Sequence, residues 1–403
     1  MKMLNFCLFN SKSVLTGNDK LDNSAVLIKD NKIFDIVTSD RLKKMDLREY
    51  QMIDTKGNYI TPGLYDSHIH GFHGYGTDQC STESILKMSE HLAQYGVVGF
   101  LPTLYPRPID EMIQIIKACT AAIGKEKGAK ILGLHLEGPF FSPEKRGAHP
   151  VSYLHEPSIK VMQKLIDAAG GIFTGSNGKR KTHIKTMTVA PELKGMRELA
   201  IFCLENNINL QAGHTNAKYE NMIEGFQVGI LHTTHFFNAM SKLDHRNPNA
   251  IGAVLIHGDV SCEIIADGHH IHPKLVLMLR KLKDISKIVL VTDGLTPNFQ
   301  TSGKLIANGD EVYIAEDGLF HSVKSNTIAG STLTMIQGLK NLIEFGYSLS
   351  DAVQASSYNP TRILNIDKKG LICHGYDANI NVLDKDFNLK LTMIESKIIF
   401  NNL

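Results

Sequence analysis

The chain has 403 residues, of which 43% are hydrophobic and 21% charged, with 43 lysines and arginines against 41 aspartates and glutamates. This composition excludes a disordered, collagen-like or coiled-coil chain, and a formal charge of +2 gives no basic surface for nucleic acid or an anionic membrane. No apolar run approaches the roughly 20 residues that span a bilayer, and the N-terminal segment is too interrupted by Asn and Ser for a secretory signal. The six cysteines form no CxxC pair, so neither a zinc ribbon nor a disulfide framework is indicated. We therefore expect a cytoplasmic protein that binds neither nucleic acid nor membrane.

Both ends of the chain are predicted to form β structure. Residues 25–28 and 33–37 indicate two strands around a polar turn, and the C-terminal segment alternates apolar and polar side chains in the same style. Neither end is long enough to bury a core of its own, so we expect the two ends to form one small sheet domain together. The predicted division of the chain is 1–60 and 366–403 for this domain and 61–365 for the rest.

The middle of the chain alternates short apolar runs with amphipathic helical patterns, which is typical of repeated β-α units. Eight strands are predicted, over Gly63–His68, Val97–Leu104, Lys130–Leu136, Thr186–Ala190, Ile208–Ala212, Ile230–Thr234, Cys262–Ala266 and Lys287–Thr292. Eight is the number of strands in a closed (β/α)8 TIM barrel. The alternative, an open doubly wound sheet, usually carries a glycine-rich phosphate turn after its first strand, and the sequence has none.

Amphipathic patterns also locate the helices. They are predicted over Thr82–Tyr95, Ile109–Ile123, Gly195–Asn206, Pro273–Lys283, Met335–Phe345 and Ser350–Ser357. Asn359 and Pro360 are expected to end the last helical region, because the residue before a proline disfavours the helical conformation. The segment Gly170–Lys181 is rich in glycine and lysine and is predicted to be a solvated loop.

Polar residues follow several predicted strands at their carboxyl ends. They are His68 and His70 at strand one, Glu137 at strand three, His214 at strand five, His235 at strand six and Asp293 at strand eight. The carboxyl ends of all strands of a parallel barrel open on one face, where catalytic groups gather. We therefore expect these distant positions to converge in space.

The residue types at these strand ends predict a metal site. His68 and His70 are two positions apart on a strand, so both imidazoles point the same way. An isolated pair of this kind is weak evidence, but together with Glu137, His214 and His235 it favours ligands of Zn²⁺ or Fe²⁺. Asp293 could cap the helix that follows, yet its place at the end of the last strand favours catalysis.

Two further residues favour an anionic substrate. Arg246 lies in the loop after strand six, and His270 lies just after strand seven. An arginine and a histidine on the active face are a reasonable clamp for a phosphate or carboxylate.

Several segments resemble one known family. They are Thr61–Gly71, Gly133–Phe140, Lys145–His149, Ala190–Glu192, Ala212–Thr215, Thr234–Met240, Ala266–Gly268, Val291–Gly294, Ile328–Met335 and Asn359–Pro360. Together they resemble the N-acetylglucosamine-6-phosphate deacetylases of the amidohydrolase superfamily over nearly the whole chain. The resemblance implies a barrel with a small β-sandwich formed from both termini.

The resemblance also implies roles for individual residues. Metal is expected on Glu137, His214 and His235. Some members replace the first two histidines with Gln and Asn and hold one ion, whereas His68 and His70 here favour one or two divalent ions. Asp293 is expected to act as acid/base while a metal-bound hydroxide attacks the acetamide, polarised by His149. The sugar phosphate is expected to contact Ala148, His149, Asn238, Ala239, Arg246, His270, Ile328, Ala329 and Gly330. The residue matching Arg246 reaches a neighbouring subunit's site in this family, so a homodimer is implied.

Three alternatives remain open at this point. Dihydroorotases and hydantoinases, which act on cyclic amides, usually bridge two metals with a carboxylated lysine, where this chain has Glu137. N-acetylgalactosamine 6-phosphate differs from the expected substrate only in configuration at C4. A metal-binding protein without catalysis would close its coordination shell and would not need the proton carrier that Asp293 provides.

Overall fold

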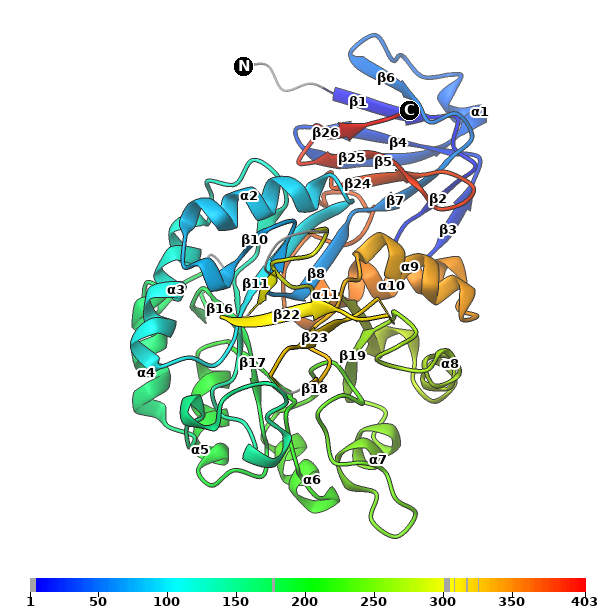
Figure 1. Ribbon diagram of the computed structural model, residues 1–403. Helices are drawn as coiled ribbons and strands as arrows, with labels where there is room; N and C mark the ends of the chain where they lie inside the picture. Colours follow the sequence, from blue (N-terminus) through cyan, green and yellow to red (C-terminus); the bar gives the residue numbers. More distant parts are fainter. Residues whose placement is uncertain (1–4, 176–177, 301–304, 308, 317, 325) are drawn as a thin grey trace.

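The computed structural model describes residues 5–175, 178–300, 305–307, 309–316, 318–324 and 326–403. Its centre is a barrel of eight parallel strands, each hydrogen-bonded to the next in chain order. The strands are β8 (Leu64–Ile69), β11 (Val97–Leu104), β13 (Leu134–Glu137), β16 (Ile184–Val189), β17 (Asn209–Ala212), β18 (His232–Thr233), β19 (Ser261–Ile265) and β20 (Ile288–Val291). They are almost wholly buried, as apolar runs flanked by helices require. The predicted barrel is confirmed (Figure 1).

The barrel closes between its last and first strands at the carboxyl end. Ile69 pairs with Gly294 in a parallel bridge, and the backbone N–H of Asp293 donates to the carbonyl of His68 at 2.8 Å. This closure places the residues that follow β20 directly beside those that end β8.

Helices surround the barrel, and six of the ten that follow lie where the amphipathic patterns predict them, whereas those over residues 159–168, 219–227, 249–256 and 358–363 were not predicted (Figure 1). They are α2 (Thr82–Ala93), α3 (Ile109–Ala122), α4 (Ile159–Ala168), α5 (Met196–Glu205), α6 (Tyr219–Gln227), α7 (Asn249–Ile256), α8 (Pro273–Leu282), α9 (Met335–Glu344), α10 (Leu349–Ser356) and α11 (Tyr358–Ile363). In α2 the buried residues Ile85, Met88 and Leu92 recur every three or four positions, which is the spacing of one helix face. Among the described residues, no helix combines the length and apolar character that crossing a lipid bilayer requires.

Two local predictions were wrong. Asn359 and Pro360 do not end the helical region, because α11 starts at Tyr358 and holds Pro360 in its first turn, where a missing N–H breaks no helical hydrogen bond. The segment Gly170–Lys181 is not only a loop. Its described part pairs β14 (Phe173–Thr174) with β15 (Arg180–Lys181) as a small antiparallel hairpin, while residues 176 and 177 lie outside the described residues.

The β-rich domain joins both ends of the chain in two sheets. One sheet has the order β5 (Lys32–Thr38), β4 (Ser24–Lys29), β1 (Asn5–Phe9) and β6 (Tyr50–Asp54). The other has the order β26 (Lys397–Asn401), β25 (Leu389–Ile394), β24 (Ile380–Leu383), β7 (Tyr59–Pro62), β2 (Ser13–Leu15) and β3 (Lys20–Asp22). The antiparallel pairing of β24 with β7 therefore connects the C-terminal strands to the N-terminal ones (Figure 1). Val26 and Ile28 share one buried cluster with Ile380 and Val382.

A three-stranded antiparallel sheet that the sequence analysis did not predict lies between β20 and α9. Its strands are β21 (Leu305–Ala307), β22 (Asp310–Ile314) and β23 (Phe320–Ser322). Leu305, Val312 and Phe320 bury their side chains against Tyr105 and Leu295, which follow β11 and β20. The sheet therefore covers part of the carboxyl end of the barrel.

Candidate metal centre and active site

Two histidines and an aspartate meet where the barrel closes. The Nε2 atoms of His68 and His70 lie 3.3 Å apart. Oδ1 of Asp293 lies 3.4 Å from the first and 3.1 Å from the second. These three side chains form one group of potential metal ligands, and all three are buried.

A second group lies beside the first and is built on Glu137 at the end of β13. The Nε2 atoms of His214 and His235 are each 3.1 Å from Oε1 of Glu137 and 3.1 Å from one another. The other carboxylate oxygen of Glu137 is 3.3 Å from Nε2 of His70. Glu137 thus joins the two groups, and the six residues that the sequence places at strand ends lie together.

The backbone turns sharply at three of these positions. His214, His235 and Asp293 have φ values of 47°, 29° and 53°, in the left-handed region that non-glycine residues rarely occupy. Each residue lies two positions after the last residue of a barrel strand. Such strained conformations concentrate at functional sites, because the surrounding fold must hold them in place.

The other ring nitrogens of the histidines fix which atoms face the centre. Nδ1 of His70 lies 3.0 Å from the carbonyl oxygen of Thr103, and Nδ1 of His214 lies 2.9 Å from that of Lys145. A carbonyl can only accept, so each Nδ1 carries a proton and each Nε2 presents a lone pair. The Nε2 lone pairs of His214 and His70 thus face the centre, at 3.1 Å and 3.3 Å from the Nε2 atoms of His235 and His68. The donor set therefore fits a divalent metal ion.

The charges around His68 favour the same conclusion. Burial lowers its pKa, but the carboxylates of Asp293, Glu263 and Glu137 outweigh this effect and raise the pKa of His68 to about 10. Such a shift means that the buried carboxylates stabilise positive charge at this point. A divalent cation held by imidazole and carboxylate ligands satisfies that requirement directly.

Sequence reasoning missed two residues that contact the ligands. Glu263 in β19 is fully buried, and its Oε2 lies 3.3 Å from Nδ1 of His68 while its Oε1 lies 3.5 Å from Nε2 of His232. The ring of Tyr105 stacks on that of His70, with centroids 3.7 Å apart. A glutamate inside an otherwise apolar strand was the available signal for Glu263, whereas nothing local marked Tyr105.

The centre opens into a cavity of about 370 Å³ at the carboxyl end of the barrel. Eight of the nine residues expected to bind the substrate line it, namely Ala148, His149, Asn238, Ala239, His270, Ile328, Ala329 and Gly330. Arg246 does not line it and lies in an exposed loop between β18 and α7.

Two histidines of this cavity have defined hydrogen-bonding states. Burial lowers the pKa of His149 to about 3, so its ring is neutral near pH 7. Nδ1 of His270 lies 2.6 Å from Oδ2 of Asp267, which can only accept when ionised, so this nitrogen carries a proton. The cavity therefore combines a neutral imidazole near the centre with a carboxylate-paired imidazole farther along.

Comparison with known proteins agrees with this geometry. The Amidohydrolase family profile matches residues 59–399. The chain is 31% identical, over 98% of its length and 97% of the relative, to a Bacillus subtilis (strain 168) protein named N-acetylglucosamine-6-phosphate deacetylase. It is 28% identical, over 84% of its length and 87% of the relative, to an Escherichia coli O157:H7 protein named N-acetylgalactosamine-6-phosphate deacetylase. The crystal structure of N-acetylglucosamine-6-phosphate deacetylase from Thermotoga maritima superposes with a TM-score of 0.84 at 29% identity, covering 98% of this chain and 100% of that one.

Proposed function

Because the chain belongs to the amidohydrolase family, we propose that it deacetylates N-acetylglucosamine 6-phosphate to glucosamine 6-phosphate and acetate. It is a hydrolase of amide C–N bonds that groups with the N-acetylglucosamine-6-phosphate deacetylases. The observation that carries the proposal is a single one: a centre of four imidazoles and two carboxylates opens into a cavity lined by the residues expected to bind an amino-sugar phosphate.

Two adjoining sets of side chains would hold the metal. Glu137, His214 and His235 would bind one divalent cation, and His68 and His70 would bind a second with Asp293 beside them. Imidazole and carboxylate ligands favour Zn²⁺ or Fe²⁺. When bound, such an ion supplies Lewis acidity that makes water a nucleophile near neutral pH and polarises an amide carbonyl.

Asp293 and His149 carry the proton and hydrogen-bond chemistry of the chain itself. Asp293 accepts a proton from the attacking water and returns it to the amide nitrogen, which cannot leave unprotonated. Its contact with Nε2 of His70 at 3.1 Å holds the carboxylate at the centre. The neutral ring of His149 donates a hydrogen bond to the carbonyl oxygen of the acetamide and stabilises the charge that develops there.

The remaining polar groups would hold the sugar phosphate. His270 and Asn238 both line the catalytic cavity, and we assign them to the phosphate end of the substrate. Arg246 is exposed and does not line the catalytic cavity of its own subunit, which supports a role in the site of a neighbouring subunit. We therefore include a homodimer in the proposal.

One experiment tests the activity and the choice of sugar. Purified protein loaded with Zn²⁺ or Fe²⁺ is assayed for acetate release from N-acetylglucosamine 6-phosphate and from its C4 epimer, and its metal content is measured in parallel. We expect one or two ions per chain and faster turnover of the glucosamine derivative. Acetate release from neither sugar phosphate by metal-loaded protein would reject the proposal, and faster release from the epimer would move the assignment to the galactosamine substrate, which the E. coli relative's name raises.

A further inference from the structure

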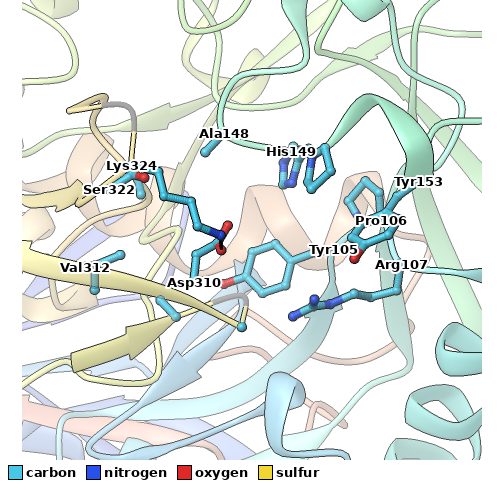
Figure 2. Close-up of a pocket in the computed structure, with 14 residues that line it drawn as sticks. Tyr105, Pro106, Arg107, Ala148, His149, Tyr153, Asp310, Val312, Ser322 and Lys324 are labelled. Atoms are coloured by element: carbon cyan, nitrogen blue, oxygen red, sulfur yellow. Dashed lines mark hydrogen bonds and ion pairs between the residues drawn. The ribbon is translucent and has the colours of Figure 1, made fainter. Parts of the chain in front are cut away.

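A second cavity of about 240 Å³ lies next to the catalytic one. The two cavities share Tyr105, Ala148, His149 and Ala329 as a common wall. The rest of the second cavity is formed by the segment after β11, the segment near Tyr153 and the sheet of β21, β22 and β23 (Figure 2). The proposed deacetylation assigns no part of its substrate to this second cavity.

The charges of the side chains that line this cavity do not sum to zero. Asp310 and Lys324 form an ion pair with one another, so their charges cancel. Arg107 faces the same cavity, and within the part of the chain that the structure describes it has neither an ion pair nor a hydrogen bond (Figure 2). The lining side chains therefore carry a net positive charge, which favours an anionic ligand.

The fold makes room for this guanidinium. A Cβ atom built on Gly309 would lie 2.6 Å from Nη2 of Arg107, so a larger residue there would displace the guanidinium, and Gly309 has a φ of +73°. Glycine at position 309 leaves free the space that the guanidinium of Arg107 occupies. The hydroxyl of Tyr105, which is buried, has no hydrogen-bond partner among the described residues.

The position of the cavity relative to the metal centre identifies the part of a substrate that would enter it. The reacting amide carbon must lie at the centre, beside His70 and Glu137. Asn238, Ala239 and His270 line only the catalytic cavity, so the sugar phosphate on the nitrogen side of the amide extends toward them. The acyl group on the other side of the carbon then points toward the wall formed by Tyr105 and His149, behind which the second cavity lies.

We propose that this second cavity is an acyl subsite that accepts N-acyl groups longer than acetyl and ending in a carboxylate, such as N-succinyl, with Arg107 binding that carboxylate. The inference rests on the proposed function, because it uses the same amide and the same centre. The reaction is the same hydrolysis: the oxygen of water bonds to the acyl carbon, the C–N bond breaks, and the nitrogen leaves with a proton. The products are glucosamine 6-phosphate and a dicarboxylate.

The test compares three substrates, the N-acetyl, N-butyryl and N-succinyl derivatives of glucosamine 6-phosphate. Butyryl and succinyl have four carbons each but differ in terminal charge. We expect the wild-type protein to favour succinyl over butyryl by roughly tenfold or more in kcat/KM, because only succinyl can form a charge-assisted hydrogen bond with Arg107. Arg107→Gln should remove this preference while changing kcat/KM for the acetyl substrate by less than about twofold. Arg107→Lys should retain part of it, because a lysine keeps the charge but not the paired donors.

The outcomes separate this inference from the proposed function. Turnover of the acetyl substrate in every variant shows that the protein is folded and that the deacetylase proposal stands. Equal kcat/KM for succinyl and butyryl in the wild type, or an equal loss for all three substrates in Arg107→Gln, would overturn the acyl subsite. Calorimetric binding of the N-succinyl derivative to wild type and Arg107→Gln decides the matter independently of turnover, since the subsite requires weaker binding by the variant.

Discussion

Oε2 of Glu263 lies 3.3 Å from Nδ1 of His68, across the interior of the barrel. Both side chains are completely buried, and the glutamate also contacts His232. The carboxylate holds the proton of His68 on Nδ1 and turns Nε2 toward Asp293 and Glu137. A carboxylate paired with the outer nitrogen of a ligating histidine both orients the ring and raises its basicity. Glu263 is therefore expected to decide how well the His68 side of the centre binds metal.

Glu263→Gln should weaken metal binding at the His68 and His70 group, because an amide keeps the shape but loses the charge that makes His68 a strong ligand. We expect a loss of affinity of roughly 10–100-fold at that group. Metal content after dialysis against graded chelator measures it directly. Glu205→Gln on the exposed face of α5 is the matched control and should leave metal content unchanged. Equal metal retention in both variants would remove this role from Glu263.

Asp293→Asn should abolish turnover while leaving metal and substrate binding nearly intact. The amide preserves the size of the side chain but cannot accept the proton of the attacking water. Loss of a positioned general acid/base typically lowers kcat by about 10²–10⁴-fold. The measurement is kcat beside the Kd of the sugar phosphate and the metal content. Near-normal turnover would reject the assignment of Asp293.

Arg246→Ala should raise KM sharply for N-acetylglucosamine 6-phosphate and little for the unphosphorylated sugar, because only the former carries the anion that Arg246 is expected to bind. Equal effects on both sugars would rule out the phosphate contact.

The same variant tests whether Arg246 serves a neighbouring site. In a hybrid dimer of one Arg246→Ala subunit and one Asp293→Asn subunit, a trans-acting arginine leaves one site with both functional residues. We therefore expect the hybrid dimer to turn over substrate at low concentration, where neither variant homodimer does. No gain in isolated hybrid dimers would place Arg246 in its own subunit's site or in no site.

Removal of divalent cations should abolish acetate release, and adding Zn²⁺ or Fe²⁺ back should restore it. The imidazole nitrogens and carboxylate oxygens of the centre lie 3.1–3.7 Å apart, an arrangement that fits a divalent cation among them. Loss of metal should also lower the melting temperature, because a ligand that binds only the folded state stabilises it. Full activity after exhaustive chelation would contradict the proposed chemistry.

Asp377→Asn should destabilise the β-rich domain in a pH-dependent way. Asp377 is 14% exposed and pairs with Lys32 of β5 and with Lys369, which joins the barrel to the C-terminal strands. Burial alone would raise the pKa of Asp377, but the two lysines hold it below its ordinary value of 3.8. Stability from this group is thus present above that value and lost as the pH falls through the lower pKa of the folded state.

We expect Asp377→Asn to lower the free energy of unfolding by about 1.5–3 kcal/mol at pH 7, the range for a hydrogen bond to a charged group. The difference from wild type should shrink below about pH 4. Denaturant unfolding followed at pH 7 and at pH 3 provides both values. A difference that stays constant over this range would show that the ionised carboxylate is not responsible.

Local patterns in the sequence predict most of the barrel. Alternating apolar runs and amphipathic stretches locate β11 and α3 to within a residue, because burial of one face imposes a period that neighbouring residues record. The polar residues at strand ends were also visible, since a histidine or glutamate directly after an apolar strand is costly to bury without a function. The sheet of β21, β22 and β23 was not visible, because its strands are only three to five residues long.

The sequence by itself determined the type of fold and the six strand-end residues that the structure brings together. Only the tertiary structure decided their partners. Glu263 contacts His68 from 195 positions away, and Tyr105 stacks on His70 from a different strand. The second cavity beside Arg107 likewise forms only when the segment after β11 meets the sheet after β20. The physical reason is that side-chain periodicity is a local consequence of burial, whereas contacts across a barrel depend on how its strands close, and no short stretch of sequence records that closure.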